Sequence, residues 1–218
     1  FEFGFVVSQT TIFFVARLDE GLALRAALGT SRPAAIYLLD GALPGHGPDI
    51  LAAGLTPCLN SLEQVAEWTG LAEAAGRTLD AAIHIDTGMN RLGLRVEEAD
   101  DLAAAPERLA GLRIGLVMSH LACAAEPAHP MNARQAASFA KVRRLFPSAR
   151  ASLANSGGCF LGEPYRFDMV RPGVSLYGGG PFERTDPRLR QVAGLHAPIL
   201  QLRDVHAGES VGYGATFA

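Results

Sequence analysis

The chain has 218 residues, of which 49% are hydrophobic, and a formal net charge of −3. This is enough for one sizeable domain with a buried core. It contains no basic run, which argues against a nucleic-acid partner, because nucleic-acid phosphates need clustered Lys and Arg. The apolar N-terminus lacks a basic flank, and no apolar run reaches the roughly 20 residues of a membrane span. We therefore expect neither a signal peptide nor a membrane partner.

The three cysteines, Cys58, Cys123 and Cys159, are odd in number and widely spaced. Such spacing fits neither a disulfide framework nor a zinc site, and the histidines also lack the spacing of metal ligands. We expect a cytoplasmic protein without a bound metal. Each cysteine is then interpreted as a small buried apolar residue.

Short apolar runs alternate with amphipathic stretches along most of the chain. The expected strands are residues 13–16, 36–39, 56–59, 81–85, 114–118, 152–154 and 168–170. The expected helices are residues 19–28, 61–75, 96–105 and 130–146. Ser61 and Gln64 have the spacing of a capping box, and Pro130 suits the first turn of a helix. The alternation predicts an α/β fold with parallel strands and helices outside.

Seven strands are one fewer than a closed TIM (β/α)8 barrel needs, and the pattern is already under way at the N-terminus. We therefore expect residues 1–190 to form an incomplete TIM barrel that lacks its first strand. Residues 191–204 show no helical period, and residues 208–213 are typical of a turn followed by a strand. We expect residues 191–218 to begin a C-terminal β-domain, with residues 181–187 as the linker.

Four polar segments follow expected strands, where barrel enzymes place their active sites. They are residues 86–91, 119–120, 155–158 and 171–174. The last two contain small residues that let backbone N–H groups approach phosphate oxygens, and Ser156 adds a hydroxyl. Each segment alone is more typical of an ordinary turn. At adjacent strand ends, the two together favour a phosphate site.

Arg91 and Arg171 both follow strand ends, and His120 follows another. A single arginine is usually a solvated surface charge. Two directed at one barrel mouth suit an anionic or aromatic ligand, because a guanidinium binds in a fixed geometry. His120 can stack on a ring or exchange protons near neutral pH, and a half-buried structural histidine explains it equally well.

Five motifs occur in one order along the chain. They are His-Ile-Asp-Thr-Gly-Met-Asn-Arg-Leu-Gly (84–93), Met-Ser-His-Leu-Ala (118–122), Ser-Leu-Ala-Asn-Ser-Gly-Gly (152–158), Val-Arg-Pro-Gly-Val-Ser-Leu-Tyr-Gly-Gly (170–179) and Val-Gly-Tyr-Gly-Ala-Thr (211–216). Together they resemble alanine racemase, a pyridoxal 5′-phosphate (PLP) enzyme that interconverts L- and D-alanine. The resemblance runs from about residue 13 to residue 218. It implies PLP as cofactor, alanine as the small-molecule substrate, D-alanine supply for peptidoglycan, and a homodimer in the full-length protein.

The resemblance also assigns roles to residues of the cofactor site. It implies that Arg91 hydrogen-bonds the phenolic oxygen of PLP and that His120 lies near the pyridine ring. Arg171 would face the pyridine nitrogen. Because arginine keeps its proton, it would hold that nitrogen unprotonated and weaken the ring as an electron sink.

The implied phosphate cradle consists of Asn155 and Ser156 with the backbone of Gly173 and Val174. Tyr213 matches the catalytic tyrosine, which reaches the partner subunit's site in a head-to-tail dimer. It acts on one face of the substrate Cα while the PLP lysine acts on the other. A phenol has an ordinary pKa of about 10, so its neighbours must help it act as a base.

Two positions depart from the family's pattern. The chain has one lysine, Lys141, in an expected helix, and nothing in residues 1–11 resembles the family's PLP-lysine motif. We therefore expect a racemase sequence truncated at both ends and inactive, or nearly so, as it stands. His84 replaces a modified lysine that orients the arginine at position 91, and we expect His84 or a bound anion to take that task.

Two alternatives to an alanine racemase remain open from the sequence. One is a non-catalytic barrel remnant that binds PLP or phosphate. The other is a racemase of the same fold that acts on another amino acid, such as serine.

Overall fold

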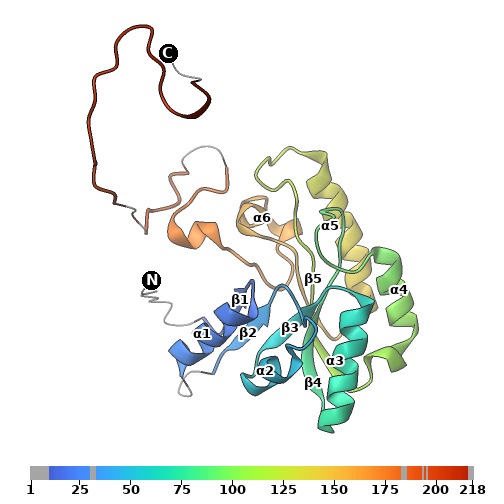
Figure 1. Cartoon of the computed structure of the whole chain (residues 1–218). Helices are drawn as coiled ribbons and strands as arrows, with labels where there is room; N and C mark the ends of the chain where they lie inside the picture. Colours follow the sequence, from blue (N-terminus) through green and yellow to red (C-terminus); the bar gives the residue numbers. More distant parts are fainter. Residues whose placement is uncertain (1–9, 30–32, 183–185, 193, 195, 216–218) are drawn as a thin grey trace.

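The computed structural model describes residues 10–29, 33–182, 186–192, 194 and 196–215. Six strands form one sheet in sequence order, and all neighbouring strands are parallel. The strands are β1 (Ile12–Val15), β2 (Ala35–Leu38), β3 (Thr56–Leu59), β4 (Leu79–His84), β5 (Leu112–Met118) and β6 (Arg150–Ser152). The helices are α1 (Leu18–Leu28), α2 (Gly47–Ala52), α3 (Leu62–Ala75), α4 (Val96–Ala104), α5 (Pro130–Val142) and α6 (Ser156–Phe160). The sheet curls into a half-barrel, with the longer helices along its outer side (Figure 1).

The two faces of the sheet have cores of different size. Because successive residues of a strand point to opposite faces, Ala81 and Ile83 of β4 join the large core beneath the helices, together with Trp68 and Phe139. The small inner core consists of Cys58, Ala82, Leu116 and Met118, with Phe14, Tyr37, Leu39 and Met169 packed against it. Cys58 is buried as predicted, whereas Cys123 and Cys159 are only partly buried.

The predicted α/β architecture with parallel strands is confirmed, and six strands lie within two residues of their predicted bounds. The seventh, at residues 168–170, was a wrong prediction: it is reduced to a single bridge between Ser152 and Met169. Phe167 has a left-handed φ of 51°, and the Asp168 carboxylate accepts a hydrogen bond from Ala151 N at 2.8 Å. The chain therefore turns sharply into this segment, which bonds to Ala151 and Ser152 at the end of a short β6 without forming a strand.

The helix predictions hold with three differences. The last predicted helix ends at Val142 and continues as a 3-10 helix, Arg143–Leu145. Helices α2 and α6 were not predicted. Helix α6 has only five residues, and two of them are glycines, which are poor helix formers. At the start of α3, Ser61 Oγ accepts from Gln64 N at 3.3 Å as predicted. Gln64 Oε1, however, accepts from Asn60 N at 2.9 Å rather than from Ser61.

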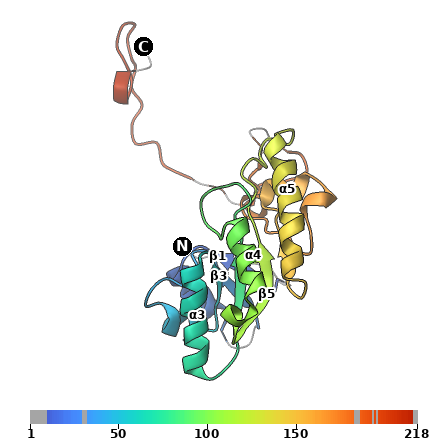
Figure 2. The same ribbon diagram turned by 90° about the vertical axis from the view of Figure 1, so that its right-hand side faces the viewer.

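Residues 186–192 still contact the half-barrel, since the Arg188 guanidinium carbon lies 4.4 Å from the centre of the Phe160 ring. Residues 196–215 lead away from it (Figures 1 and 2). The expected turn near Gly208 is present, Val211 forms only an isolated bridge where the strand was predicted, and a 3-10 helix, Tyr213–Ala215, begins at the last residue of that segment. The described residues of this segment add no strand to the sheet. The domain boundary at residue 190 stays a prediction, and residues 1–9 and linker residues 183–185 lie outside the described residues. No helix in the described part of the chain is long and apolar enough to cross a membrane.

Candidate functional site

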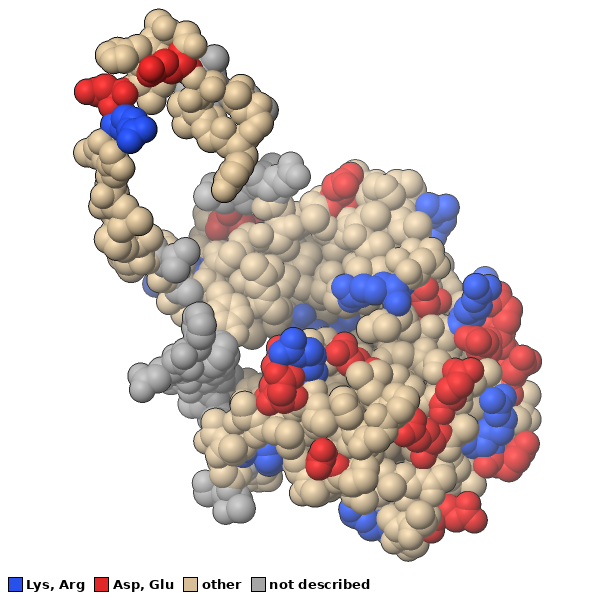
Figure 3. All heavy atoms as spheres, in the orientation of Figure 1, with Lys and Arg blue, Asp and Glu red and all other residues tan. Residues whose placement is uncertain are grey.

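Polar side chains gather at the end of the half-barrel where the strands have their carboxyl ends. His84 is the last residue of β4, His120 follows β5, and Asn155 follows β6. Arg171 lies just beyond the bridge at Met169. Parallel strands bring these positions to one edge of the sheet. Figure 3 shows basic side chains in a hollow near the middle of the molecule, while acidic and basic side chains are mixed along its right-hand side.

Arg171 is held firmly among these residues. Its guanidinium donates to Ser152 Oγ and, at 2.6 Å, to the carbonyl oxygen of Ser119. The guanidinium carbon lies 5.8 Å from the centre of the Phe14 ring. Burial lowers the pKa of Arg171 to about 10, so the side chain stays protonated at neutral pH. The site therefore contains a fixed, partly buried positive charge that donates hydrogen bonds and accepts none.

His120 and Asn155 are in direct contact. Asn155 Oδ1 accepts from Gly158 N at 3.0 Å and so caps α6, which leaves Nδ2 as the donor. This Nδ2 lies 3.2 Å from the carbonyl oxygen of Leu121 and 3.3 Å from His120 Nε2. His120 Nε2 is then the acceptor. Burial, with Arg171 and Arg91 nearby, lowers the pKa of His120 to about 4, so the ring is neutral at pH 7.

The Ser156 hydroxyl faces backbone N–H groups of the segment after Arg171. Its Oγ accepts from Gly173 N at 2.8 Å and lies 3.4 Å from Ser175 N. Ser175 Oγ is buried and has no hydrogen-bond partner within the described residues. Val174 begins a 3-10 helix, Val174–Tyr177, and is exposed. The structure thus brings Asn155, Ser156, Gly173 and Val174 to one region, and their role as a phosphate cradle stays a prediction.

The glycines after Ser156 allow close packing. A Cβ at Gly157 would lie 2.7 Å from the carbonyl oxygen of Ala124, and one at Gly158 would lie 2.8 Å from Leu121 Cδ1. Both positions are buried in α6. The absence of side chains here therefore lets α6 pack closely against the loop after β5, which an open phosphate loop would not require.

Arg91 extends from a rigid loop. The Asp86 carboxylate accepts hydrogen bonds at 2.8 Å from the backbone N–H groups of Gly88, Met89 and Asn90. Arg91 itself is exposed, and it makes no hydrogen bond or ion pair with any other described residue. It lies close enough to lower the pKa of His120.

His84 bonds to Asn60, so the expected contact with Arg91 is not present. Asn60 Nδ2 donates to the carbonyl oxygen of Leu39 at 2.9 Å, which leaves Asn60 Oδ1 to accept from His84 Nδ1 at 2.8 Å. Burial is the main cause that lowers the pKa of His84 to about 4, and Arg171 adds to it. The ring is therefore neutral, with its proton on Nδ1.

Residues 6–181 match the family described as the alanine racemase N-terminal domain. The chain belongs to this family. A catabolic alanine racemase of Agrobacterium fabrum is 47% identical over 218 aligned positions, which cover 97% of this chain and 56% of the relative. The alanine racemase of Rhodospirillum rubrum is 48% identical, with 94% and 54% covered. The chain thus spans about half the length of these relatives.

Solved alanine racemase structures share the fold. The Bartonella henselae enzyme, a structure with covalently bound pyridoxal phosphate, aligns with a TM-score of 0.77 and 36% identity, covering 83% of this chain and 52% of that one. The Streptomyces coelicolor enzyme aligns with a TM-score of 0.81 and 30% identity, covering 97% and 59%.

Tyr213, which matches the family's catalytic tyrosine, and Lys141, the single lysine, both lie away from this site. Tyr213 is fully exposed in the segment that leaves the half-barrel. Lys141 is exposed one residue before the end of α5, as predicted for a solvated helix charge. Because α5 runs back from the carboxyl end of β5 toward the start of β6, Lys141 lies at the opposite end of the half-barrel from Arg171.

The structure adds three polar residues to which the sequence assigned no role, and it gives a structural role to Ser119 of the predicted segment 119–120. Asn60 orients His84, Ser119 and Ser152 hold Arg171, and the buried Gln135 of α5 bonds to the loop after β5. Asn60 directly follows β3, so its position at a strand end was a usable clue. Gln135 lies in a helix, where nothing in the sequence distinguishes it from a surface glutamine.

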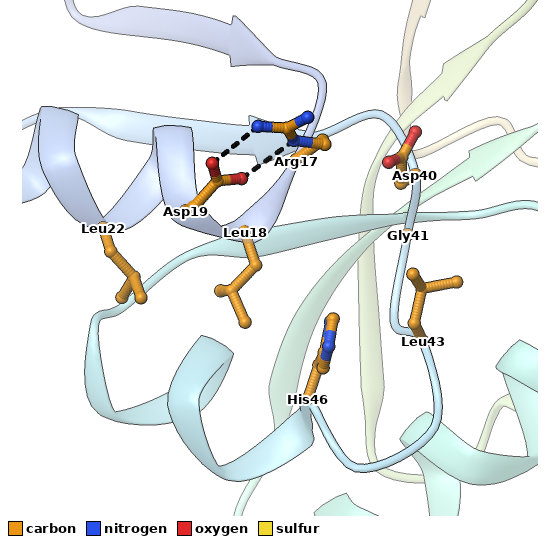
Figure 4. Close-up of a pocket in the computed structure, with 8 residues that line it drawn as sticks. All are labelled: Arg17, Leu18, Asp19, Leu22, Asp40, Gly41, Leu43 and His46. Atoms are coloured by element: carbon orange, nitrogen blue, oxygen red, sulfur yellow. Dashed lines mark hydrogen bonds and ion pairs between the residues drawn. The ribbon is translucent and has the colours of Figure 1, made fainter.

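A separate pocket of about 300 Å³ lies beside the start of α1 and the loop after β2 (Figure 4). Its charged lining includes Arg17 and Asp19, which form an exposed ion pair at 2.7 Å. It contains none of the predicted site residues. The pocket adjoins the carboxyl ends of β1 and β2, whereas His120, Asn155 and Arg171 lie outside it, at the ends of β5 and β6.

Proposed function

We propose that this chain forms the cofactor-holding part of an alanine racemase that interconverts L- and D-alanine with PLP. The observation that carries the proposal is the grouping of His120, Asn155 and Arg171 at the carboxyl ends of β5 and β6. Membership of the alanine racemase N-terminal domain family supports it, as does the likeness to a Bartonella henselae structure with covalently bound pyridoxal phosphate.

The donor groups around Ser156 fit the phosphate of PLP. A phosphate ester needs several N–H and O–H donors at close range. The Gly173 N–H and the Ser156 hydroxyl lie together here, and the buried Ser175 hydroxyl lacks a partner in the described residues. A Cβ at Gly173 would meet nothing within 4 Å, so this backbone is open to a ligand. We propose that Asn155, Ser156, Gly173 and Val174 hold the phosphate.

When bound, PLP withdraws electrons from a substrate amino acid and makes its Cα proton acidic. In the proposal, Arg171 donates a hydrogen bond to the pyridine nitrogen and keeps it unprotonated. Neutral His120 packs beside the ring without adding a positive charge, and Arg91 turns inward to bind the phenolic oxygen. The positive charges of Arg91 and Arg171 also favour an anionic ligand over a neutral one.

We propose that Tyr213 holds or releases a proton at its phenolic oxygen on one face of the substrate, in the site of a partner subunit. Its place on an exposed segment away from its own half-barrel supports a role in another chain. Lys141 lies too far from Arg171 to serve as the lysine that acts on the other face. These 218 residues alone are therefore expected to bind PLP without a covalent bond and to racemise alanine slowly or not at all.

PLP titration of the 218-residue chain tests the proposal, with absorbance and Trp68 fluorescence as readouts. We expect saturable binding that Arg171→Met and His120→Ala weaken at least about tenfold, a loss of about 1.4 kcal/mol. Arg203→Met, at an exposed position after residue 186, is the matched control and should bind PLP as the wild type does. Equal binding by all four proteins, or none by the wild type, would refute the proposal.

Racemisation is assayed on the same protein as D-alanine formed from L-alanine with added PLP, and L-serine in parallel tests the other substrate. We propose a cytoplasmic role in supplying D-alanine for peptidoglycan. The A. fabrum relative is named catabolic, so a role in alanine breakdown is the second candidate. A D-alanine requirement in a deletion strain would support the peptidoglycan role, and loss of growth on either enantiomer of alanine as the sole carbon source would support the catabolic one.

A further inference from the structure

The buried side chain of Gln135 in α5 connects the loops that follow β4 and β5. Gln135 is fully buried, with 0% of its surface exposed. Its Oε1 accepts from Ala122 N at 2.9 Å. Its Nε2 donates to the carbonyl oxygen of His120 at 2.9 Å and lies 3.4 Å from Thr87 Oγ1. One amide thus contacts the backbone on both sides of Leu121 and a side chain of residues 86–91, which we call the Arg91 loop.

Hydrogen bonds within the Arg91 loop connect the position of Thr87 to the position of Arg91. Thr87 Oγ1 also lies 2.8 Å from Ser119 Oγ, a second link to the end of β5. Asp86 accepts from three consecutive N–H groups just beyond Thr87, which makes the loop a compact unit. A Cβ at Gly88 would lie 3.7 Å from Gln135 Cγ, so this loop rests directly on α5.

We propose that Gln135 is a positioning residue that sets where the Arg91 loop lies relative to His120. The inference rests on the proposed function, in which both side chains contact PLP. A polar side chain with partners on both loops limits them to one relative arrangement, because any displacement leaves a buried amide group unpaired. This preorganises two ligand contacts that come from different strands.

Asn132 provides a matched control on the same helix. It is also buried, and its Nδ2 donates to the carbonyl oxygens of Cys123 and Glu126 at 3.2 and 2.9 Å. Both partners belong to the loop after β5. Removing the Asn132 amide should therefore destabilise α5 packing without releasing the Arg91 loop.

The first test is amide hydrogen exchange of the full chain without PLP, comparing Gln135→Met with Asn132→Leu. Methionine keeps the unbranched length of glutamine and removes both polar ends. We expect the amides of Gly88, Met89 and Asn90 to exchange about tenfold faster in Gln135→Met, after correction for the change in core amides of β4. Asn132→Leu should change them only as much as the core. Equal loop exchange in both variants would overturn the proposal.

The second test is PLP affinity of the folded variants. Gln135→Glu keeps the acceptor for Ala122 N and loses the donor for His120 and Thr87, so it tests the proposal even where Gln135→Met fails to fold. We expect either Gln135 variant to bind PLP about five- to tenfold more weakly, and Asn132→Leu to bind as the wild type does. Unchanged affinity in both Gln135 variants would also overturn it. Absence of binding by the wild type would instead refute the proposed function, and the exchange experiment would still decide the role of Gln135.

Discussion

Two neutral, buried histidines should make this fold less stable in acid. The loss should begin at a pH well above the range in which most carboxylates titrate. The pKa of His84 and the pKa of His120 both fall from the ordinary 6.5 to about 4, with burial as the largest cause. In the unfolded chain both rings bind protons near pH 6.5. Between pH 6.5 and 4 the unfolded state therefore binds more protons than the folded state, so stability falls as the pH falls. Above pH 6.5 the full contribution is present.

The size of the effect follows from the two shifts. At about 1.4 kcal/mol per pKa unit, each ring costs about 2 kcal/mol on going from pH 7 to pH 5, and the two together about 4 kcal/mol. Because small domains are stable by only about 5–15 kcal/mol, this is a large fraction. Urea unfolding at pH 7, 6 and 5, followed by Trp68 fluorescence, measures it directly.

The variants that isolate the effect are His84→Gln, His120→Gln and the double substitution. Each removes a titrating ring, so the dependence of unfolding free energy on pH should flatten stepwise while the absolute stability at pH 7 can fall. His206→Gln, at an exposed position, should keep the wild-type slope. A double variant that loses stability between pH 7 and pH 5 as steeply as the wild type would refute the reasoning.

Five further substitutions at four positions give separate outcomes. Asn155→Ala should lower the free energy of unfolding by about 2 kcal/mol, measured by thermal unfolding, because it removes the α6 cap and a partly buried donor. Asn155→Asp keeps the cap and should lower it less. Gly157→Ala should cost about 1–3 kcal/mol because its Cβ would meet Ala124 O at 2.7 Å, and Gly173→Ala, with open space around it, should cost less than about 0.5 kcal/mol in the same assay. Ser156→Ala should weaken binding of PLP about tenfold and leave binding of pyridoxal, which lacks the phosphate, unchanged.

Most of the fold followed from hydrophobic patterning because parallel strands and their covering helices repeat a strong local signature. The predictions failed where tertiary contacts decide the outcome. The segment at residues 168–170 has the apolar character of a strand but follows a left-handed Phe167 and a β6 of only three residues. Helix α6 contains two glycines that are poor helix formers, and its stability comes from the Asn155 cap and close packing on Ala124.

The positions of the site residues could be predicted further than their partners. Strand ends and family motifs identified His120, Asn155 and Arg171, because the carboxyl ends of parallel strands must meet. The partners depend on side-chain directions that no local pattern encodes. His84 therefore bonds to Asn60 across the sheet where Arg91 was expected, and Gln135 could not be told from any other helical glutamine.

The single lysine, exposed near the end of α5, gives the chain a useful chemical asymmetry. Amine-reactive dyes, spin labels or surface coupling can attach to only one side chain, at the end of the molecule opposite the strand mouth. A tether there would leave the polar hollow free for ligands. The same geometry means that any pyridoxal adduct recovered on Lys141 after reduction would report chance modification of an outer helix.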